Sequence, residues 1–98
     1  MVLETALIHV QADRVEEFLA ALPRGIELLK RAKGFVDIEV RTGVELEHAV
    51  LLLLRWETLE DHTVGFREGP LFPQWRDVIG PFFAEPPTVT HWRATDLA

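Results

Sequence analysis

The chain has 98 residues, which is enough for one domain and too few for two domains with separate cores. Its formal net charge is -6 and its ten basic residues are scattered along the sequence, which argues against nucleic acid or an anionic membrane as a partner. The absence of cysteine and serine excludes disulfides, thiolate metal sites and Ser-His-Asp hydrolysis.

The first third of the chain predicts a strand followed by a helix. Residues 2–10 are mostly β-branched and aliphatic, which is typical of a strand. Asp13 is a good N-cap with Glu16 three positions on, so a helix is predicted from there. Apolar residues recur at helical steps to about residue 32, and Pro23 within this run predicts a kink or a division of the helix.

The middle of the chain predicts two strands. Residues 35–42 alternate between apolar and charged side chains, with Val36, Ile38 and Val40 on one face, which indicates a half-buried strand. After a polar turn, residues 48–56 are apolar on both faces over most of their length. A strand of this kind needs cover on both sides, so we expect it at the centre of a sheet.

The last third predicts two short helices and a final strand. Thr58 is a plausible N-cap, with Asp61 completing a capping box, and residues 69–70, a Gly-Pro pair, end this first helix. A second helical stretch is predicted from residue 71 to about residue 83. After Pro86 and Pro87, polar and apolar side chains alternate again over residues 88–95, which predicts a strand.

The order of elements predicts a single α+β domain over residues 1–98. It is the ferredoxin-like βαββαβ order, with a four-stranded antiparallel sheet and helices on one face. The other face is left bare, so we expect a homodimer formed through the open sheet face. The longest apolar run, residues 49–54, is far too short to span a membrane, and acidic Glu4 lies where a signal peptide would carry basic residues. A cytoplasmic location is therefore expected.

Several segments together resemble antibiotic biosynthesis monooxygenase (ABM) domains, and the likeness covers nearly the whole chain. They are Gly34-Phe35, the run Leu54-Arg55-Trp56-Glu57-Thr58-Leu59-Glu60-Asp61-His62, the following Phe66 and Phe72, and the closing Pro86-Pro87-Thr88-Val89-Thr90-His91-Trp92. The resemblance implies a dimeric α/β barrel with an apolar cavity between the helices and the sheet of each subunit. Members oxidise polycyclic aromatic compounds to quinones without a metal or flavin, degrade haem, or have no assigned activity.

The chain departs from the residue sets of both active groups in this family. Haem-degrading members use an asparagine, a tryptophan and a histidine, and quinone-forming members use asparagine, tryptophan and tyrosine, whereas this chain has no asparagine or tyrosine. Those sets therefore do not carry over. Trp56 matches the strand-end tryptophan of the family, and we place it among the candidate catalytic residues.

His62 is the first candidate for acid-base chemistry. It lies one helical turn from Phe66 and six residues after Trp56, so it could face the cavity, where an imidazole can take or give a proton near neutral pH. A surface or capping role on the helix is the alternative. His9 and His91, near the ends of the first and last strands in the sequence, could line a pocket or hydrogen-bond at a sheet edge. His48 is expected to be solvated.

Aromatic residues and arginines are the candidates for substrate binding. An aromatic wall could hold a flat, apolar ligand, although residues at helical spacing are more often simply core. Its members would be Trp56, Phe66, Phe72, Trp75, Phe82 and Phe83. Arg55 and Arg67 could anchor an acidic group of the ligand, or form exposed ion pairs with neighbouring glutamates. No cofactor is expected, and the histidines lack the spacing of a zinc site.

Three functions remain open from the sequence. The first is a cofactor-independent monooxygenase acting on a flat aromatic or polyketide-like molecule, with His62 as the base. The second is a non-catalytic dimeric binding or scaffold module, which the missing Asn and Tyr favour. The third is a haem-binding or haem-degrading protein. A continuous pocket containing His62 would favour the enzyme, and a collapsed interior would favour the scaffold.

Overall fold

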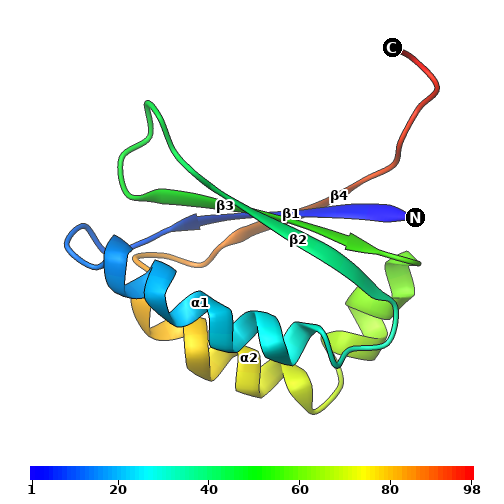
Figure 1. Cartoon of the computed structure of the whole chain (residues 1–98), viewed down its shortest axis with the longest axis horizontal. Coiled ribbons are helices and arrows are strands. Elements are labelled where there is room, and N and C mark those ends of the chain that lie inside the picture. The colour runs from blue at the N-terminus through cyan, green and yellow to red at the C-terminus, as the bar shows by residue number, and fades with distance from the viewer.

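The computed structural model describes all 98 residues as a four-stranded antiparallel sheet with the helices against one face (Figure 1). The strands are β1 (Val2–His9), β2 (Phe35–Thr42), β3 (Ala49–Trp56) and β4 (Thr88–Trp92), in the order β2-β3-β1-β4. The helices are α1 (Val15–Leu29), η1 (Asp61–Phe66), α2 (Leu71–Ile79) and the 3₁₀ turn η2 (Gly80–Phe82). The ferredoxin-like α+β fold predicted from the sequence is confirmed.

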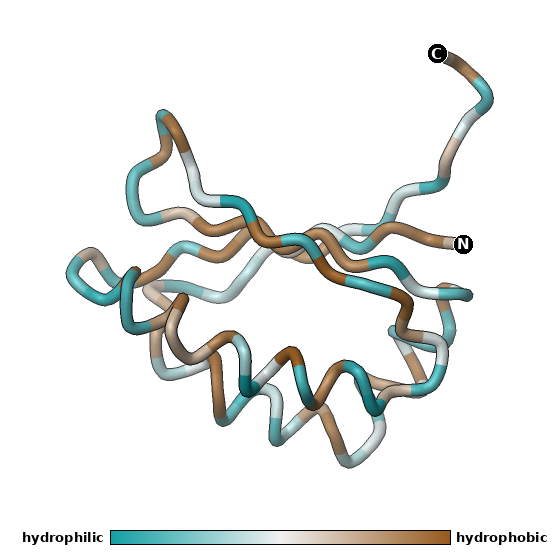
Figure 2. The backbone as a smooth tube through the Cα atoms, viewed as in Figure 1, coloured by the Kyte–Doolittle hydropathy of each residue, from teal (hydrophilic) through white to brown (hydrophobic).

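The core lies between the helices and the two central strands. Alternate residues of β1 and β3 point toward the helices. Figure 2 shows the hydrophobic residues that recur along the strands and the helices on either side of this layer. Helix α1 contributes the buried Phe18, Leu22 and Leu29 to this layer. From the strands come Glu4, Ala6, Ile8, Val50, Leu52, Leu54 and Trp56, all of them buried. Glu4 is the one acidic residue in this set.

Helix α1 differs from its prediction in three ways. It is continuous from Val15 to Leu29, although Pro23 lies inside it. Pro23 is exposed and has no N–H to donate, so the carbonyl group four residues before it can bond to water instead. The apolar face of the helix continues in phase beyond Pro23. The N-cap is Arg14, with no side-chain cap, where Asp13 was predicted, and the helix ends three residues before residue 32.

A bulge in β2 corrects the predicted strand face. The pairing with β3 shifts between Phe35 and Asp37, so that Phe35 pairs with Trp56 and Asp37 pairs with Arg55. The extra residue turns Val36 outward, where it is 41% exposed, and Phe35 takes the inward place. Val36 therefore does not share the core face with Ile38 and Val40, contrary to the prediction.

The last third of the chain follows the prediction with altered ends. The Thr58 cap is confirmed, because the backbone N–H of Asp61 donates to Thr58 Oγ1 at 3.1 Å, but the helix that follows is a π-helical turn. Helix α2 stops at Ile79, since Gly80 and Pro81 tighten the chain into η2, and β4 ends at Trp92.

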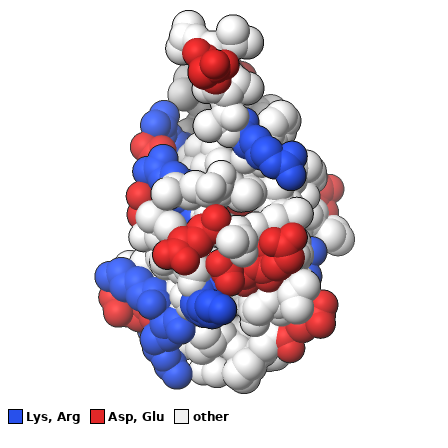
Figure 3. Space-filling model, turned by 90° about the vertical axis from the view of Figure 1, so that its right-hand side faces the viewer, with Lys and Arg blue, Asp and Glu red and all other residues white.

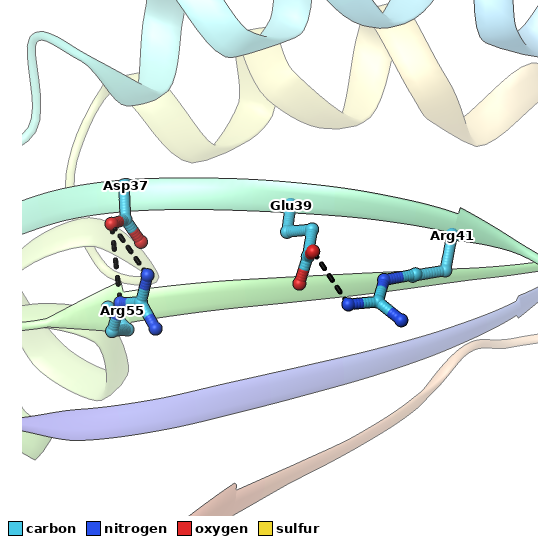
Figure 4. A network of polar contacts seen from close by, with 4 residues as sticks. All are labelled: Asp37, Glu39, Arg41 and Arg55. Atoms are coloured by element: carbon cyan, nitrogen blue, oxygen red, sulfur yellow. Dashed lines mark hydrogen bonds and ion pairs between the residues drawn. The ribbon is translucent and has the colours of Figure 1, made fainter.

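The opposite face of the sheet carries no helix. Leu51 and Leu53 of β3 are half-buried there, beside an ion pair of 2.9 Å between Arg55 and Asp37. Figure 4 shows this pair and the Arg41–Glu39 pair on β2 and β3. The chain by itself therefore covers only one side of the sheet. None of its helices is long and apolar enough to cross a membrane.

Close packing of the two helices at Gly25 gives a first prediction. A methyl group added at Gly25 would lie 2.6 Å from Cζ3 of Trp75, so Gly25→Ala should lower the free energy of unfolding by about 1–3 kcal/mol. Gly80→Ala is the matched control, because its nearest neighbour would be 3.6 Å away. Urea denaturation measures both changes, and an equal loss in the two variants would show that the contact with Trp75 is not tight.

Candidate functional site

A cavity of about 270 Å³ lies between the sheet and the helices. Its walls are mainly apolar and include Ala6, Ile8, Leu52, Phe66, Phe72 and Trp75. Four polar side chains also line it: Glu4 and His62, which are buried, and Arg67 and Arg76, which are exposed and so mark the open side of the cavity. The cavity is thus apolar, with a buried acid and a buried imidazole on its wall.

Glu4 is the functional candidate that the sequence analysis missed. It lies in the middle of β1 and is only 6% exposed. Oε1 of Glu4 accepts a hydrogen bond of 2.9 Å from Nε1 of Trp56 and lies 3.3 Å from Nε2 of His62. Burial raises the pKa of Glu4 from 4.5 to about 7, against the opposing effects of the Trp56 hydrogen bond and the positive charge of Arg67.

His62 is held in place by the π-helical turn. The backbone N–H of Arg67 donates to the carbonyl of His62, five residues back, which is the wide spacing of a π-helix. The imidazole is 3% exposed and stacks on Trp56, with the ring centres 5.1 Å apart. Burial lowers the pKa of His62 to about 4, helped by Arg67 and His91, so the ring is neutral near neutral pH.

His91 joins the same group from the edge strand β4. The register places it opposite Glu4, and its Nε2 lies 2.8 Å from Nδ1 of His62. Burial and Arg67 lower the pKa of this half-buried histidine as well. Side chains from β1, η1 and β4 therefore form a continuous chain of polar contacts that runs from Glu4 through His62 to His91.

Several other predicted site residues lie at or directly behind the cavity. Phe66, Phe72 and Trp75 line the cavity, together with Phe83. Trp56 is fully buried behind it, where it contacts Glu4 and His62.

Three predicted substrate-binding residues lie elsewhere. Arg55 is on the opposite face of the sheet, since adjacent residues of a strand point to opposite sides, and pairs with Asp37 (Figure 4). Nε2 of His9 lies 3.5 Å from Oε1 of Glu85. Phe82 packs on Phe18, with the ring centres 5.9 Å apart. Of the two arginines proposed as anchors, Arg67 is the one that lines the cavity.

Charges on the surface do not form a basic stripe on the face shown in Figure 3, where acidic and basic side chains are interspersed. The cationic groups at the cavity are Arg67 and Arg76. They could attract an acidic group on a bound ligand.

Glu4 and His62 should contribute opposite pH dependences to stability. Folding raises the pKa of Glu4 from 4.5 to about 7, so its contribution is present below pH 4.5 and is lost as the pH rises to about 7. Folding lowers the pKa of His62 from 6.5 to about 4, so its contribution is present above pH 6.5 and is lost as the pH falls to about 4. The two effects oppose each other between pH 4.5 and 6.5.

The variant Glu4→Gln tests this balance. Between pH 4.5 and about 7 its free energy of unfolding should rise relative to the parent protein by about 3 kcal/mol, because only the parent must ionise a buried acid. Urea denaturation at a series of pH values measures the difference. Glu45→Gln, in the exposed β2–β3 turn, should leave the shape of the pH curve unchanged. Parallel curves for Glu4→Gln and the parent protein would contradict the raised pKa.

Comparison with known proteins agrees with this fold. The family model described as "Antibiotic biosynthesis monooxygenase" matches residues 1–78. The uncharacterised protein YczJ of Bacillus subtilis is 34% identical over 93 residues, which are 95% of this chain and 98% of that protein. A solved structure from Bordetella bronchiseptica that carries the same family description is 34% identical, covers 96% of both chains and gives a TM-score of 0.92.

A more distant structure has the same fold. It is a monooxygenase from the gene ActVA-Orf6 of Streptomyces coelicolor, solved in complex with the ligand Nanaomycin D. It is 19% identical, with a TM-score of 0.76 over 99% of this chain and 91% of that one. From the family match and the two relatives at 34% identity, the chain belongs to the antibiotic biosynthesis monooxygenase family.

Proposed function

We propose that this protein is a cofactor-independent monooxygenase that binds a flat aromatic or polyketide-like small molecule in its cavity. The observation that carries the proposal is the pairing of an apolar cavity with a buried acid-base group. The cavity measures about 270 Å³, and Glu4 and His62 lie 3.3 Å apart on its wall. A ligand of a few fused rings suits such a site, because small-molecule pockets are mostly apolar with a few polar groups that fix orientation.

The reaction needs a substrate whose own electrons can reduce dioxygen. A methylene group between aromatic rings loses one proton to the protein, and the resulting carbanion transfers electrons to O₂ and forms a C–O bond. The peroxide regains a proton, and loss of water, which carries the second C–H hydrogen, leaves a ketone. In sum, CH₂ and O₂ give C=O and H₂O. The protein would supply a water-poor cavity, a base and a shape that orients the rings.

Positive charges at the opening of the cavity would stabilise an anionic intermediate. Arg67 and Arg76 line the cavity and are exposed, so they can approach a phenolate or enolate oxygen of the bound ligand. The aromatic side chains of Phe66, Phe72 and Trp75 would contact the rings. Among proteins of the same fold, SnoaB of Streptomyces nogalater is a cofactor-independent oxygenase, which supports the reaction class proposed here.

A binding module without chemistry is the second candidate. The lack of asparagine and tyrosine favours it, since the resemblance gives those residues to the quinone-forming members of the family. Such a module would bind the same class of ligand and consume no oxygen. Haem ligation has less support, because both ring nitrogens of His62 lie close to protein partners, Glu4 and His91.

A homodimer is part of the proposal. Leu51 and Leu53 are only half-buried on the sheet face that lacks helices, and a second copy would cover them. Sedimentation should give twice the mass of one chain, and Leu51→Glu should shift the protein to single subunits, because pairing would bury the introduced charge. Gln74→Glu, on an exposed position of α2, is the control and should leave the dimer intact. A parent protein that sediments as one folded subunit would remove the dimer.

Oxygen uptake tests the enzymatic proposal. The parent protein should consume O₂ when it is mixed with 1,8-dihydroxyanthrone, and Ala6→Leu should slow this reaction by about tenfold or more, because the larger side chain fills the cavity. Ala20→Leu is the matched control, since it makes the same change on an exposed position of α1.

An oxygen trace that stays unchanged across a panel of reduced polycyclic aromatics would rule out the proposed monooxygenase activity. Titration calorimetry then decides whether the binding module stands. Binding retained by Ala20→Leu and lost by Ala6→Leu would support that module.

A further inference from the structure

We propose that Glu4 takes the proton of the substrate and that His62 and His91 form a relay that exchanges this proton with solvent. The inference rests on the proposed function and assigns the base within its site. Glu4 is the catalytic residue in this scheme because it lines the cavity, and His91 acts through His62.

The three side chains lie in sequence from the cavity to the protein surface. Oε1 of Glu4 is 3.3 Å from Nε2 of His62, and Nδ1 of His62 is 2.8 Å from Nε2 of His91. The first contact is slightly longer than an ordinary hydrogen bond, and contacts of catalytic groups commonly shorten when substrate binds. His62 therefore uses opposite sides of its ring to contact the acid and the outer histidine, which is the arrangement a proton relay requires.

Because Glu4 and His62 are buried, a proton on Glu4 needs a route to solvent. Glu4 is 6% exposed and His62 is 3% exposed, and both line the cavity. A flat ligand that fills the cavity would exclude the water there. His91 is half-buried and lines a separate hollow with Thr90 and Trp92. The route through His91 thus connects Glu4 to solvent without passing through the ligand.

Two complementary arrangements of protons satisfy these contacts. With Glu4 ionised, Nε2–H of His62 donates to the carboxylate and Nε2–H of His91 donates to Nδ1 of His62. With Glu4 protonated, the acid donates to Nε2 of His62 and Nδ1–H of His62 donates to Nε2 of His91. One arrangement changes into the other when each group passes one proton outward and Nδ1 of His91 releases one to water. Both histidines remain neutral in the two end states.

The surroundings keep the two arrangements close in free energy. Burial raises the pKa of Glu4 to about 7, so the acid and the carboxylate are both populated near neutral pH. Burial, and after it the positive charge of Arg67, disfavours a cationic form of either histidine. From α1 only the apolar Leu29 reaches the cavity. The polar groups around Glu4 and His62 are Trp56 from β3, His91 from β4, Arg67 after η1 and Arg76 from α2.

Proton balance is maintained over the cycle. The proton that Glu4 takes from the C–H bond leaves through His62 and His91 while the substrate anion reacts with O₂. An equivalent proton returns along the same route and is donated by Glu4 to the peroxide. Each turnover therefore leaves the three side chains in their starting state.

Nuclear magnetic resonance of the ¹⁵N-labelled histidine rings tests the relay without any substrate. Between about pH 6 and about pH 8.5, the proton on His62 should move from Nδ1 to Nε2 as Glu4 ionises. Glu4→Gln should hold His62 in one tautomer over the same range, because the titrating group is gone. A parent protein in which His62 keeps one tautomer throughout would overturn the relay.

Oxygen uptake by His91→Gln is the second test. The amide keeps a hydrogen bond to His62 but cannot pass a proton on, so uptake should fall by about tenfold or more and recover in part when imidazole is added. The fall should be smaller at higher pH, where hydroxide can accept the proton. His48→Gln, in the exposed β2–β3 turn, is the matched control and should retain the parent rate.

The two tests separate the relay from the proposed function. A tautomer shift in a protein that consumes no oxygen supports the relay and removes the oxygenase. Oxygen uptake by His91→Gln at the parent rate overturns the relay and leaves the oxygenase in place. If His91→Gln fails to fold, the measurement on the parent protein still decides the question.

Discussion

Burial of the Glu4 carboxyl group on the inner face of the sheet is the constraint on which the rest of the site depends. Removing a carboxylate from water is costly unless it gains hydrogen bonds or opposite charge, or stays protonated. Trp56 and His62 provide close partners, at 2.9 Å and 3.3 Å, and Arg67 provides a positive charge. Because the Trp56 hydrogen bond and the Arg67 charge stabilise the ionised form without fully offsetting burial, the pKa of Glu4 settles at about 7. The group is therefore able to titrate near neutral pH, which an exposed glutamate would not do.

The partners of Glu4 reach it because local structure turns them inward. Trp56 ends β3 on the helix-facing side, where the β2 bulge brings Phe35 against its ring, with ring centres 5.5 Å apart. The Thr58 cap starts the chain into the π-helical turn, whose wide spacing places both His62 and Phe66 on the buried side. π-Helical turns are rare and are frequently found at functional sites. Here the π-helical turn holds the His62 imidazole between Trp56 and His91.

Local patterns predicted much of the fold, and tertiary register decided the rest. The alternation in residues 88–95 and the Thr58 cap were visible in the sequence, and His62 and Trp75 were identified as candidates from their helical spacing. Glu4 entered the sequence analysis only as an acidic residue near the N-terminus, because nothing local shows that it pairs across the sheet with His91 and lies beside Trp56. Arg55 was named as a ligand anchor although it follows Leu54, a core residue, and so must point to the other face. Predicting that Val36 faces outward would have required knowledge of the bulge in β2.

The site also bears on how a member of this family can lack the expected asparagine and tyrosine. A fold specifies a cavity between sheet and helices, and function depends on the side chains placed around that cavity. In this chain an acid and a histidine lie on the cavity wall and a second histidine lies behind them, and these groups exchange protons, whereas amide and phenol side chains mainly orient and stabilise an anion. In the proposed enzyme, the tasks of orienting and stabilising would fall to Arg67, Arg76 and the aromatic residues that line the cavity, Phe66, Phe72, Trp75 and Phe83. A substrate with a less acidic C–H bond would need the stronger base that a buried carboxylate with a raised pKa provides, so the composition of this site favours such a substrate.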